Sequence, residues 1–156
     1  MNLNNLLTKN FLPPQISKFL PILFLVGGFI GFLDASYLSV LHYKNIIPPC
    51  SILGECETVL TSKYAVVWGV PTALFGAFYY LAVVILSVLY LDTKNKRYIA
   101  VATGAITVGF IFTFWFFYLQ AFVIKAFCEY CLVSAVVTTV LFVSAIVCWF
   151  KNKSTS

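Results

Sequence analysis

The stretch that decides the fold covers residues 127–150 and reads FCEYCLVSAVVTTVLFVSAIVCWF. From Leu132 onward it contains no charged residue. A helix needs about 20 mainly apolar residues to cross the hydrocarbon core of a membrane. The stretch therefore predicts a membrane-spanning helix that begins at a pair of cysteines, Cys128 and Cys131.

Other apolar runs precede this one, at about residues 19–41, 72–91 and 98–124. The sequence is 62% hydrophobic and 10% charged, whereas soluble domains carry about 25% charged residues. This composition excludes a soluble globular protein. We predict an all-α membrane protein, a four-transmembrane-helix bundle over residues 19–150 between an N-terminal arm (1–18) and a short tail (151–156). The first run lacks a small-residue cleavage site, which predicts a retained helix rather than a signal peptide.

The longest break in hydrophobicity separates the first two runs, at residues 42–68. Within this loop the segment around Glu57–Tyr64 predicts a short amphipathic helix on the surface. In the first run, Gly27, Gly28 and Gly31 lie on adjacent helical positions and predict the close approach of a neighbouring helix.

Lysine and arginine residues are distributed unevenly between the two sides of the predicted bundle. The basic residues are Lys9, Lys18, Lys94, Lys96, Arg97, Lys151 and Lys153 on the side of both termini, and Lys44, Lys63 and Lys125 on the other side. Cytoplasmic loops carry the excess of basic residues. Both termini are therefore predicted to be cytoplasmic, and the cysteine-bearing loops to lie outside. This orientation explains the formal net charge of +5, and the scattered basic residues predict no nucleic-acid partner.

Four of the five cysteines gather on the predicted outer side, as the pairs Cys50/Cys56 and Cys128/Cys131, while Cys148 falls at the inner end. Residues three apart share one face of a helix. The first helical turn favours a thiolate, which is the form that attacks a disulfide. The second pair is therefore suited to redox cycling, and the two pairs together predict a relay.

Less specific interpretations of these cysteines stay open. Both pairs are also compatible with structural disulfides in a membrane scaffold or transporter subunit. A zinc site is disfavoured because the gap between Cys50 and Cys56 is wider than the usual ligand spacing, and we predict no metal. Four cysteines allow three pairings. Cys148 is predicted to be a small hydrophobic residue without a redox role.

A set of motifs gives the sequence a resemblance to a known family. A wide cysteine pair in the first outer loop is followed by Ser62, Trp68-Gly69-Val70-Pro71, Leu74-Phe75-Gly76 and a CxxC that opens the last helix. This order resembles the bacterial homologues of vitamin K epoxide reductase over roughly residues 20–150. The resemblance implies a four-helix bundle around a quinone, ubiquinone or menaquinone, in the bacterial inner membrane. Many homologues carry a fused thioredoxin-like domain, whereas here the partner is expected to be a separate protein.

The resemblance also implies a function and an electron path. The protein would be a quinone-dependent thiol oxidase that reoxidises a separate, periplasmic DsbA-like thioredoxin-fold partner and so drives disulfide formation in exported proteins. The partner would attack Cys50, Cys56 would exchange with Cys128, and Cys131 would be freed as a thiolate beside the quinone. Physiological quinone reduction, in which the net flow serves the quinone rather than the partner, is an alternative.

The resemblance further implies the residues that contact the quinone. They are Ser62, Thr72, Phe75 and Cys131. Members that act on vitamin K epoxide have a tyrosine and an asparagine where this chain has Ala135 and Thr72, so plain quinone reduction is expected here.

Asp34 is the only acidic residue inside a predicted crossing apart from Glu129 at the start of the fourth. An ionisable residue within a membrane helix is costly and is a functional candidate by default. Reduction of a quinone consumes protons, so Asp34 is a candidate proton route. A structural hydrogen bond to a neighbouring helix is the alternative, and the sequence favours neither.

Overall fold

The computed structural model describes residues 19–50 and 55–153. The predicted arm at 1–18 and the last residues of the tail lie outside this part of the chain. The long helices are α2 (Phe19–Tyr43), α4 (Thr72–Thr93), α5 (Lys96–Tyr118) and α6 (Glu129–Lys153). Together with η1 (Leu119–Ile124), which continues α5, they form four segments long and apolar enough to cross a membrane. The predicted all-α, four-helix membrane bundle is confirmed.

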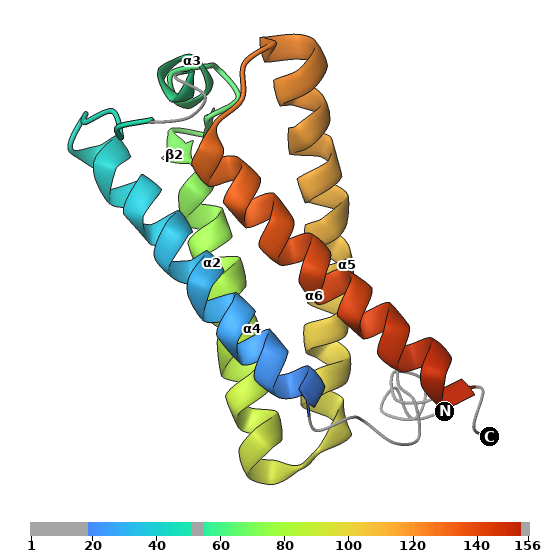
Figure 1. The fold of residues 1–156 in the computed structure, drawn as a ribbon. Coiled ribbons are helices and arrows are strands. Elements are labelled where there is room, and N and C mark those ends of the chain that lie inside the picture. The colour runs from blue at the N-terminus through green and yellow to red at the C-terminus, as the bar shows by residue number, and fades with distance from the viewer. Residues whose placement is uncertain (1–18, 51–54, 154–156) are drawn as a thin grey trace.

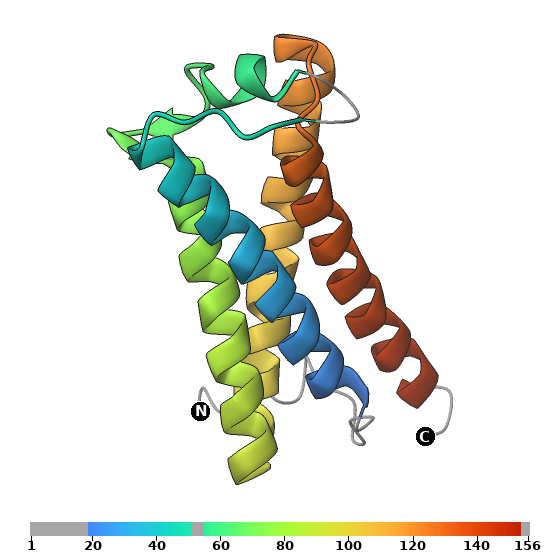
Figure 2. The same ribbon diagram turned by 60° about the vertical axis from the view of Figure 1, so that its left-hand side comes forward.

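The long helices form a ring in which α2 packs against α4 and α6, while α5 packs against the same two helices from the other side (Figure 1). Helix α2 begins and α6 ends at one end of the bundle. The short helix α3 (Cys56–Leu60) lies at the opposite end, where the first crossing, α2, ends. From a second direction, α3 and the described residues that follow α2, up to Cys50, lie across this end (Figure 2).

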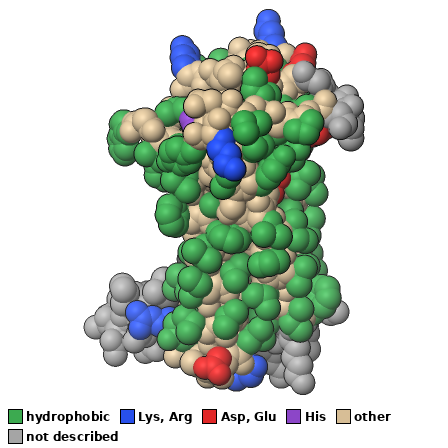
Figure 3. Space-filling model, turned by 90° about the vertical axis from the view of Figure 1, so that its left-hand side faces the viewer, with side chains coloured by type: hydrophobic (Ala, Val, Ile, Leu, Met, Phe, Trp, Pro, Cys, Tyr) green, Lys and Arg blue, Asp and Glu red, His purple; other side chains and the backbone are tan. Residues whose placement is uncertain are grey.

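The surface shows how the bundle fits a membrane. Hydrophobic side chains cover its middle, while charged side chains gather at its two ends (Figure 3). Two apolar helices gain little from the hydrophobic effect when they associate in lipid, so close packing must hold the bundle together. A core cluster with members from all four long helices, including Phe24, Val83, Ile106 and Leu141, provides this packing.

The glycines of α2 allow its close contacts, as the sequence predicted. A Cβ atom at Gly27 would lie 2.7 Å from the Leu141 side chain of α6. One at Gly31 would overlap the ring of Tyr80 in α4. Such approaches are too close for a real side chain, so small residues at these positions let α2 pack against both neighbours.

The connection between α2 and α4 contains a short hairpin that the sequence analysis did not predict. Strands β1 (Val66–Val67) and β2 (Val70–Pro71) pair antiparallel around Trp68 and Gly69. Both turn residues have positive φ angles, 52° and 79°, which the two-residue turns of type I′ require. Trp68 is 97% exposed at the tip, where a tryptophan fits the membrane interface. Helix α4 begins directly after Pro71.

The third crossing differs from the single helix expected over residues 98–124. Helix α5 already begins at Lys96, because Asn95 caps it by accepting the N–H of Arg97. At the other end the chain widens into the π-helix η1, and Lys125 then adopts a left-handed conformation with φ of 57°. This change of winding sets the direction in which the chain enters the CxxC segment.

Candidate redox site

Four of the cysteines, Cys50, Cys56, Cys128 and Cys131, meet in one cluster at the α3 end of the bundle. Cys56, Val59, Ala126 and Cys128 form its buried centre, and Cys50 and Cys131 pack against them. Cys50 and Cys56 are joined as a disulfide, whereas Cys128 and Cys131 are free thiols. The structure thus resolves the three possible pairings, and the bonded pair offers no thiolate to a metal ion.

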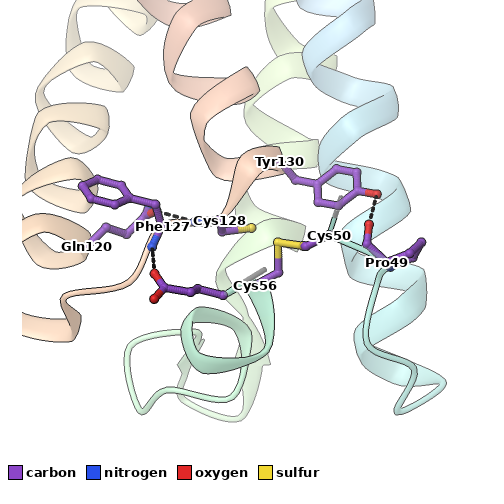
Figure 4. Close-up of a disulfide and its surroundings, with 8 residues drawn as sticks. Pro49, Cys50, Cys56, Gln120, Phe127, Cys128 and Tyr130 are labelled. Atoms are coloured by element: carbon purple, nitrogen blue, oxygen red, sulfur yellow. Dashed lines mark hydrogen bonds between the residues drawn. A yellow bond between two sulfur atoms is a disulfide. The ribbon is translucent and has the colours of Figure 1, made fainter. Parts of the chain in front are cut away.

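The two cysteines of the disulfide differ in their access to solvent. Cys56 begins α3 and is only 1% exposed. Cys50, in the chain that follows α2, is half-buried. The sulfur of Cys128 points toward this disulfide (Figure 4). Cys50 is therefore the more accessible member of the pair, while Cys56 is enclosed together with Cys128.

Cys128 occupies the cap position of α6. Its carbonyl accepts the N–H of Leu132 at 3.0 Å, although the helix proper begins at Glu129. Its sulfur accepts hydrogen bonds from the Cys131 thiol and from the backbone N–H groups of Tyr130 and Cys131. The sulfur therefore satisfies amide groups that a serine or aspartate would satisfy at an ordinary helix start.

These hydrogen bonds act on the acidity of Cys128. The bond from the Cys131 thiol, together with the two backbone bonds, lowers the pKa of Cys128 from 9.0 to about 7, against the opposing effects of burial and of Asp34. The sequence analysis expected the stabilised thiolate at Cys131. In this reduced state the stabilising bonds converge on Cys128 instead, because its sulfur lies at the cap and Cys131 lies one turn inside the helix.

Two hydrogen bonds fasten the disulfide segment to the residues around the CxxC (Figure 4). The Tyr130 hydroxyl donates to the Pro49 carbonyl, next to Cys50, at 3.3 Å. The backbone N–H of Phe127 donates to the Glu55 carboxylate, next to Cys56, also at 3.3 Å. Each cysteine of the disulfide is thus preceded by a residue bonded to a neighbour of a CxxC cysteine. We call these two bonds the clasp.

Gln120 supports the CxxC from η1. Its side-chain oxygen accepts the N–H of Cys128 at 3.0 Å, and its backbone carbonyl accepts the N–H groups of Lys125 and Ala126. The Gln120 side chain is buried. Gln120 therefore bonds to both ends of the connection between η1 and α6.

The sequence analysis did not identify Gln120, Glu55 or Tyr130. Gln120 had a detectable signal, because it is the only amide side chain in the apolar run at residues 98–124. A buried amide in such a run needs hydrogen-bond partners. Glu55 and Tyr130 gave no such signal, since their role depends on contacts between segments far apart in the sequence.

The four residues predicted to contact a quinone differ in their hydrogen bonds and in their exposure. The Ser62 hydroxyl donates to the Val59 carbonyl at 2.7 Å, and the Thr72 hydroxyl donates to the Ala65 carbonyl at 3.1 Å. Both hydroxyl protons are therefore committed to the backbone. Phe75 is half exposed on α4, and Cys131 is half-buried in α6. A role for these four residues in quinone binding stays a prediction.

Asp34 is better placed to bond a polar ligand than Ser62 and Thr72, because it has an atom without a partner among the described residues. Its Oδ2 atom is buried and has no hydrogen-bond partner among the described residues. The carboxylate is close enough to act electrostatically on Cys128. A buried polar atom without a partner is unusual, and a quinone reduced nearby offers such an atom a hydrogen-bonding group. This unpartnered oxygen, within electrostatic reach of Cys128, is a feature of the described residues that fits a quinone near the CxxC.

The sequence pattern of the vitamin K epoxide reductase family matches residues 22–146, which include α4 and α5, most of α2 and α6, and the four clustered cysteines. This chain belongs to the vitamin K epoxide reductase family. No curated protein matches the chain significantly. Family membership makes this protein a multi-pass membrane oxidoreductase with thiol–disulfide chemistry, in a family that is linked to quinones.

Proposed function

We propose that this family member is a quinone-dependent thiol oxidase that reoxidises a DsbA-like thioredoxin-fold partner and thereby drives disulfide formation in exported proteins. The observation that carries the proposal is the pairing of a Cys50–Cys56 disulfide with a reduced CxxC in one cluster. This is the arrangement expected after two electrons have moved from the outer pair to the inner pair.

The first exchange is proposed to occur at Cys50. A partner thiolate attacks the Cys50 sulfur, the Cys50–Cys56 bond breaks, and Cys56 leaves as a thiolate. The second thiol of the partner then attacks the mixed disulfide, so that the partner leaves oxidised and both outer cysteines are reduced. The half-buried position of Cys50 supports this order, because an incoming protein thiol must reach the sulfur along the axis of the disulfide bond.

The second exchange moves the electrons inward. The Cys56 thiolate attacks Cys128 of a closed Cys128–Cys131 disulfide and releases Cys131. Cys50 then attacks Cys56, and Cys128 leaves as a thiolate. The low pKa of Cys128 favours this direction, because a more acidic thiol is a better leaving group and a stabilised reduced form makes a pair more oxidising.

When bound, a quinone supplies an acceptor for the two electrons and two protons held by the reduced CxxC. Cys131, Ser62, Thr72 and Phe75 are the residues proposed to hold it. Asp34 is proposed to pass protons, since its buried Oδ2 atom lacks a partner among the described residues. In the proposed orientation the protein spans a bacterial inner membrane with both termini in the cytoplasm and the four cysteines on the periplasmic side.

Reconstitution tests the proposal. The purified protein in lipid is mixed with a reduced DsbA-type partner and either a short-chain ubiquinone or a short-chain menaquinone. Loss of partner thiols that depends on a quinone is the expected result. Because the Cys50–Cys56 disulfide can oxidise one partner molecule by itself, repeated turnover without any quinone, or no repeated turnover with either quinone, would refute the proposal. Net reduction of partner disulfides by a quinol would support the opposite direction of flow.

A further inference from the structure

The helix η1 contacts both reacting segments of the relay. It packs against α3, whose first residue is Cys56. It also bonds to Cys128 through the side-chain oxygen of Gln120. The two segments that must exchange a disulfide therefore share one support.

The backbone N–H of Cys128 needs an acceptor of this kind. Cys128 is buried, and its sulfur already takes the N–H groups of Tyr130 and Cys131. Its own N–H lies outside the hydrogen-bond pattern of α6 and is closed off from water. Gln120 accepts it at 3.0 Å. This bond restricts the rotation of Cys128 about its backbone and with it the direction of the sulfur.

We propose that Gln120 is a positioning residue that holds Cys128 against Cys56 for disulfide exchange. The proposal rests on the proposed relay, since it concerns the bond through which that relay passes. Gln120 acts through the backbone amide of Cys128, to which its side-chain oxygen is bonded. Small displacements of reacting groups lower rates and effective concentrations strongly, so the side-chain oxygen matters for chemistry as well as for packing.

The test measures how readily Cys56 and Cys128 bond to each other. Cys50, Cys131 and Cys148 are changed to Ala in the full chain, which leaves only these two thiols. The variant is equilibrated in lipid with mixtures of reduced and oxidised glutathione. The fraction closed gives the effective concentration of one thiol at the other. Closing transfers two electrons to oxidised glutathione and releases two molecules of reduced glutathione.

Three substitutions separate the acceptor from the volume of the side chain. Gln120→Met keeps the volume without an acceptor, and we expect the effective concentration to fall about tenfold or more. Gln120→Asn withdraws the acceptor by one methylene and should cause a similar loss. Gln120→Glu keeps an acceptor oxygen in either protonation state, and we expect a value within about threefold of the parent.

The matched control removes a buried hydrogen bond far from the cysteines. The buried Ser87 hydroxyl donates to the Val83 carbonyl within α4, so Ser87→Ala should leave the effective concentration unchanged. Equal values for parent and Gln120→Met would overturn the inference and leave the relay intact. A value for Gln120→Glu as low as that for Gln120→Met would also overturn it. A parent that never closes would overturn both the inference and the relay.

Discussion

The two cysteine pairs of this protein are supported in different ways. Cys128 and Cys131 stand at the start of a long helix, and the amide of Cys128 is fixed by a buried side chain. Cys50 and Cys56 lie on the connection between α2 and α4, fastened to the CxxC segment by the two bonds of the clasp. We expect the two pairs to act differently. The helix pair, Cys128 and Cys131, stays in place, and the loop pair, Cys50 and Cys56, reacts in turn with the partner and with the helix pair.

The largest effect should come from the cysteines on the relay. Replacement of Cys56 or Cys128 by Ala removes a sulfur that must form a bond, so quinone-dependent oxidation of the partner should fall about a thousandfold or more. Cys148→Ala is the matched control and should keep full activity, because Cys148 packs near the core at the other end of the bundle. Comparable activity in Cys56→Ala and Cys148→Ala would break the comparison.

The next prediction concerns the acidity of the Cys128 thiol. With the outer disulfide closed and Cys148 changed to Ala, ultraviolet absorbance should report one thiolate with a pKa of about 7, that of Cys128. The thiolate is the form that the hydrogen bonds stabilise, so it should be about one tenth populated at pH 6 and about nine tenths at pH 8. A more populated thiolate at pH 8 means a more stable reduced CxxC at that pH.

Cys131→Ala tests the cause of this acidity. It removes the hydrogen bond that contributes most to the lowered pKa of Cys128. The midpoint should move toward 9.0, and the thiolate population at pH 7 should fall by at least about fivefold. An unchanged midpoint would show that the helix start alone controls Cys128.

The third prediction separates the effect of the Glu55 hydrogen bond on the transfer rate from the effect of its negative charge. Glu55→Ala removes the carboxylate that accepts the Phe127 N–H, next to Cys56. A hydrogen bond to a charged group contributes about 1.5–3 kcal/mol, and less where it is exposed to solvent. We therefore expect transfer from the outer pair to the CxxC to slow by about fivefold, measured by rapid mixing with a reduced partner and acid quenching. The same loss in Glu57→Ala, which removes an equal charge from the same helix α3, would show that charge matters and the clasp does not.

The sequence predicted the bundle well because its signals were local. Each crossing is an apolar run of sufficient length, and the glycine positions in α2 follow from helical spacing. The positions of η1 and the hairpin were missed, because apolar periodicity does not distinguish a π-helix from an α-helix and a two-residue strand is too short for a pattern.

The site was predicted in its members and less well in its geometry. Cysteine spacing and order identified Cys50, Cys56, Cys128 and Cys131, which the structure brings into one cluster. Which sulfur carries the stabilised charge depends on the residue at which α6 begins, and a shift of a few residues changes the answer. The clasp joins positions more than seventy residues apart, by separations of 72 and 81, so no local pattern indicates it.

The smallest expected effect comes from the other bond of the clasp. Tyr130→Phe removes the hydroxyl that donates to the Pro49 carbonyl but keeps the ring, which packs 5.6 Å from the ring of Tyr37. Because this bond restrains the segment that carries Cys50, its loss should let small thiols reduce the outer disulfide about two- to threefold faster. The measurement is the rate at which glutathione opens the Cys50–Cys56 bond in a protein whose CxxC cysteines are replaced by Ala.

Tyr43→Phe is the control, since it removes a hydroxyl from an exposed tyrosine at the end of α2 and should leave this rate unchanged. A slower rate in Tyr130→Phe would mean that the hydroxyl aids the attack on Cys50. The direction of the change in rate matters, because a faster opening in Tyr130→Phe would give the two bonds of the clasp distinct consequences. Loss of the Glu55 bond weakens transfer toward the CxxC, whereas loss of the Tyr130 bond makes Cys50 easier to reach from outside. One bond of the clasp would then control the reaction of the loop pair with the CxxC, and the other its reaction with thiols from outside. The helix pair depends instead on its fixed position and on the hydrogen bonds that stabilise the Cys128 thiolate.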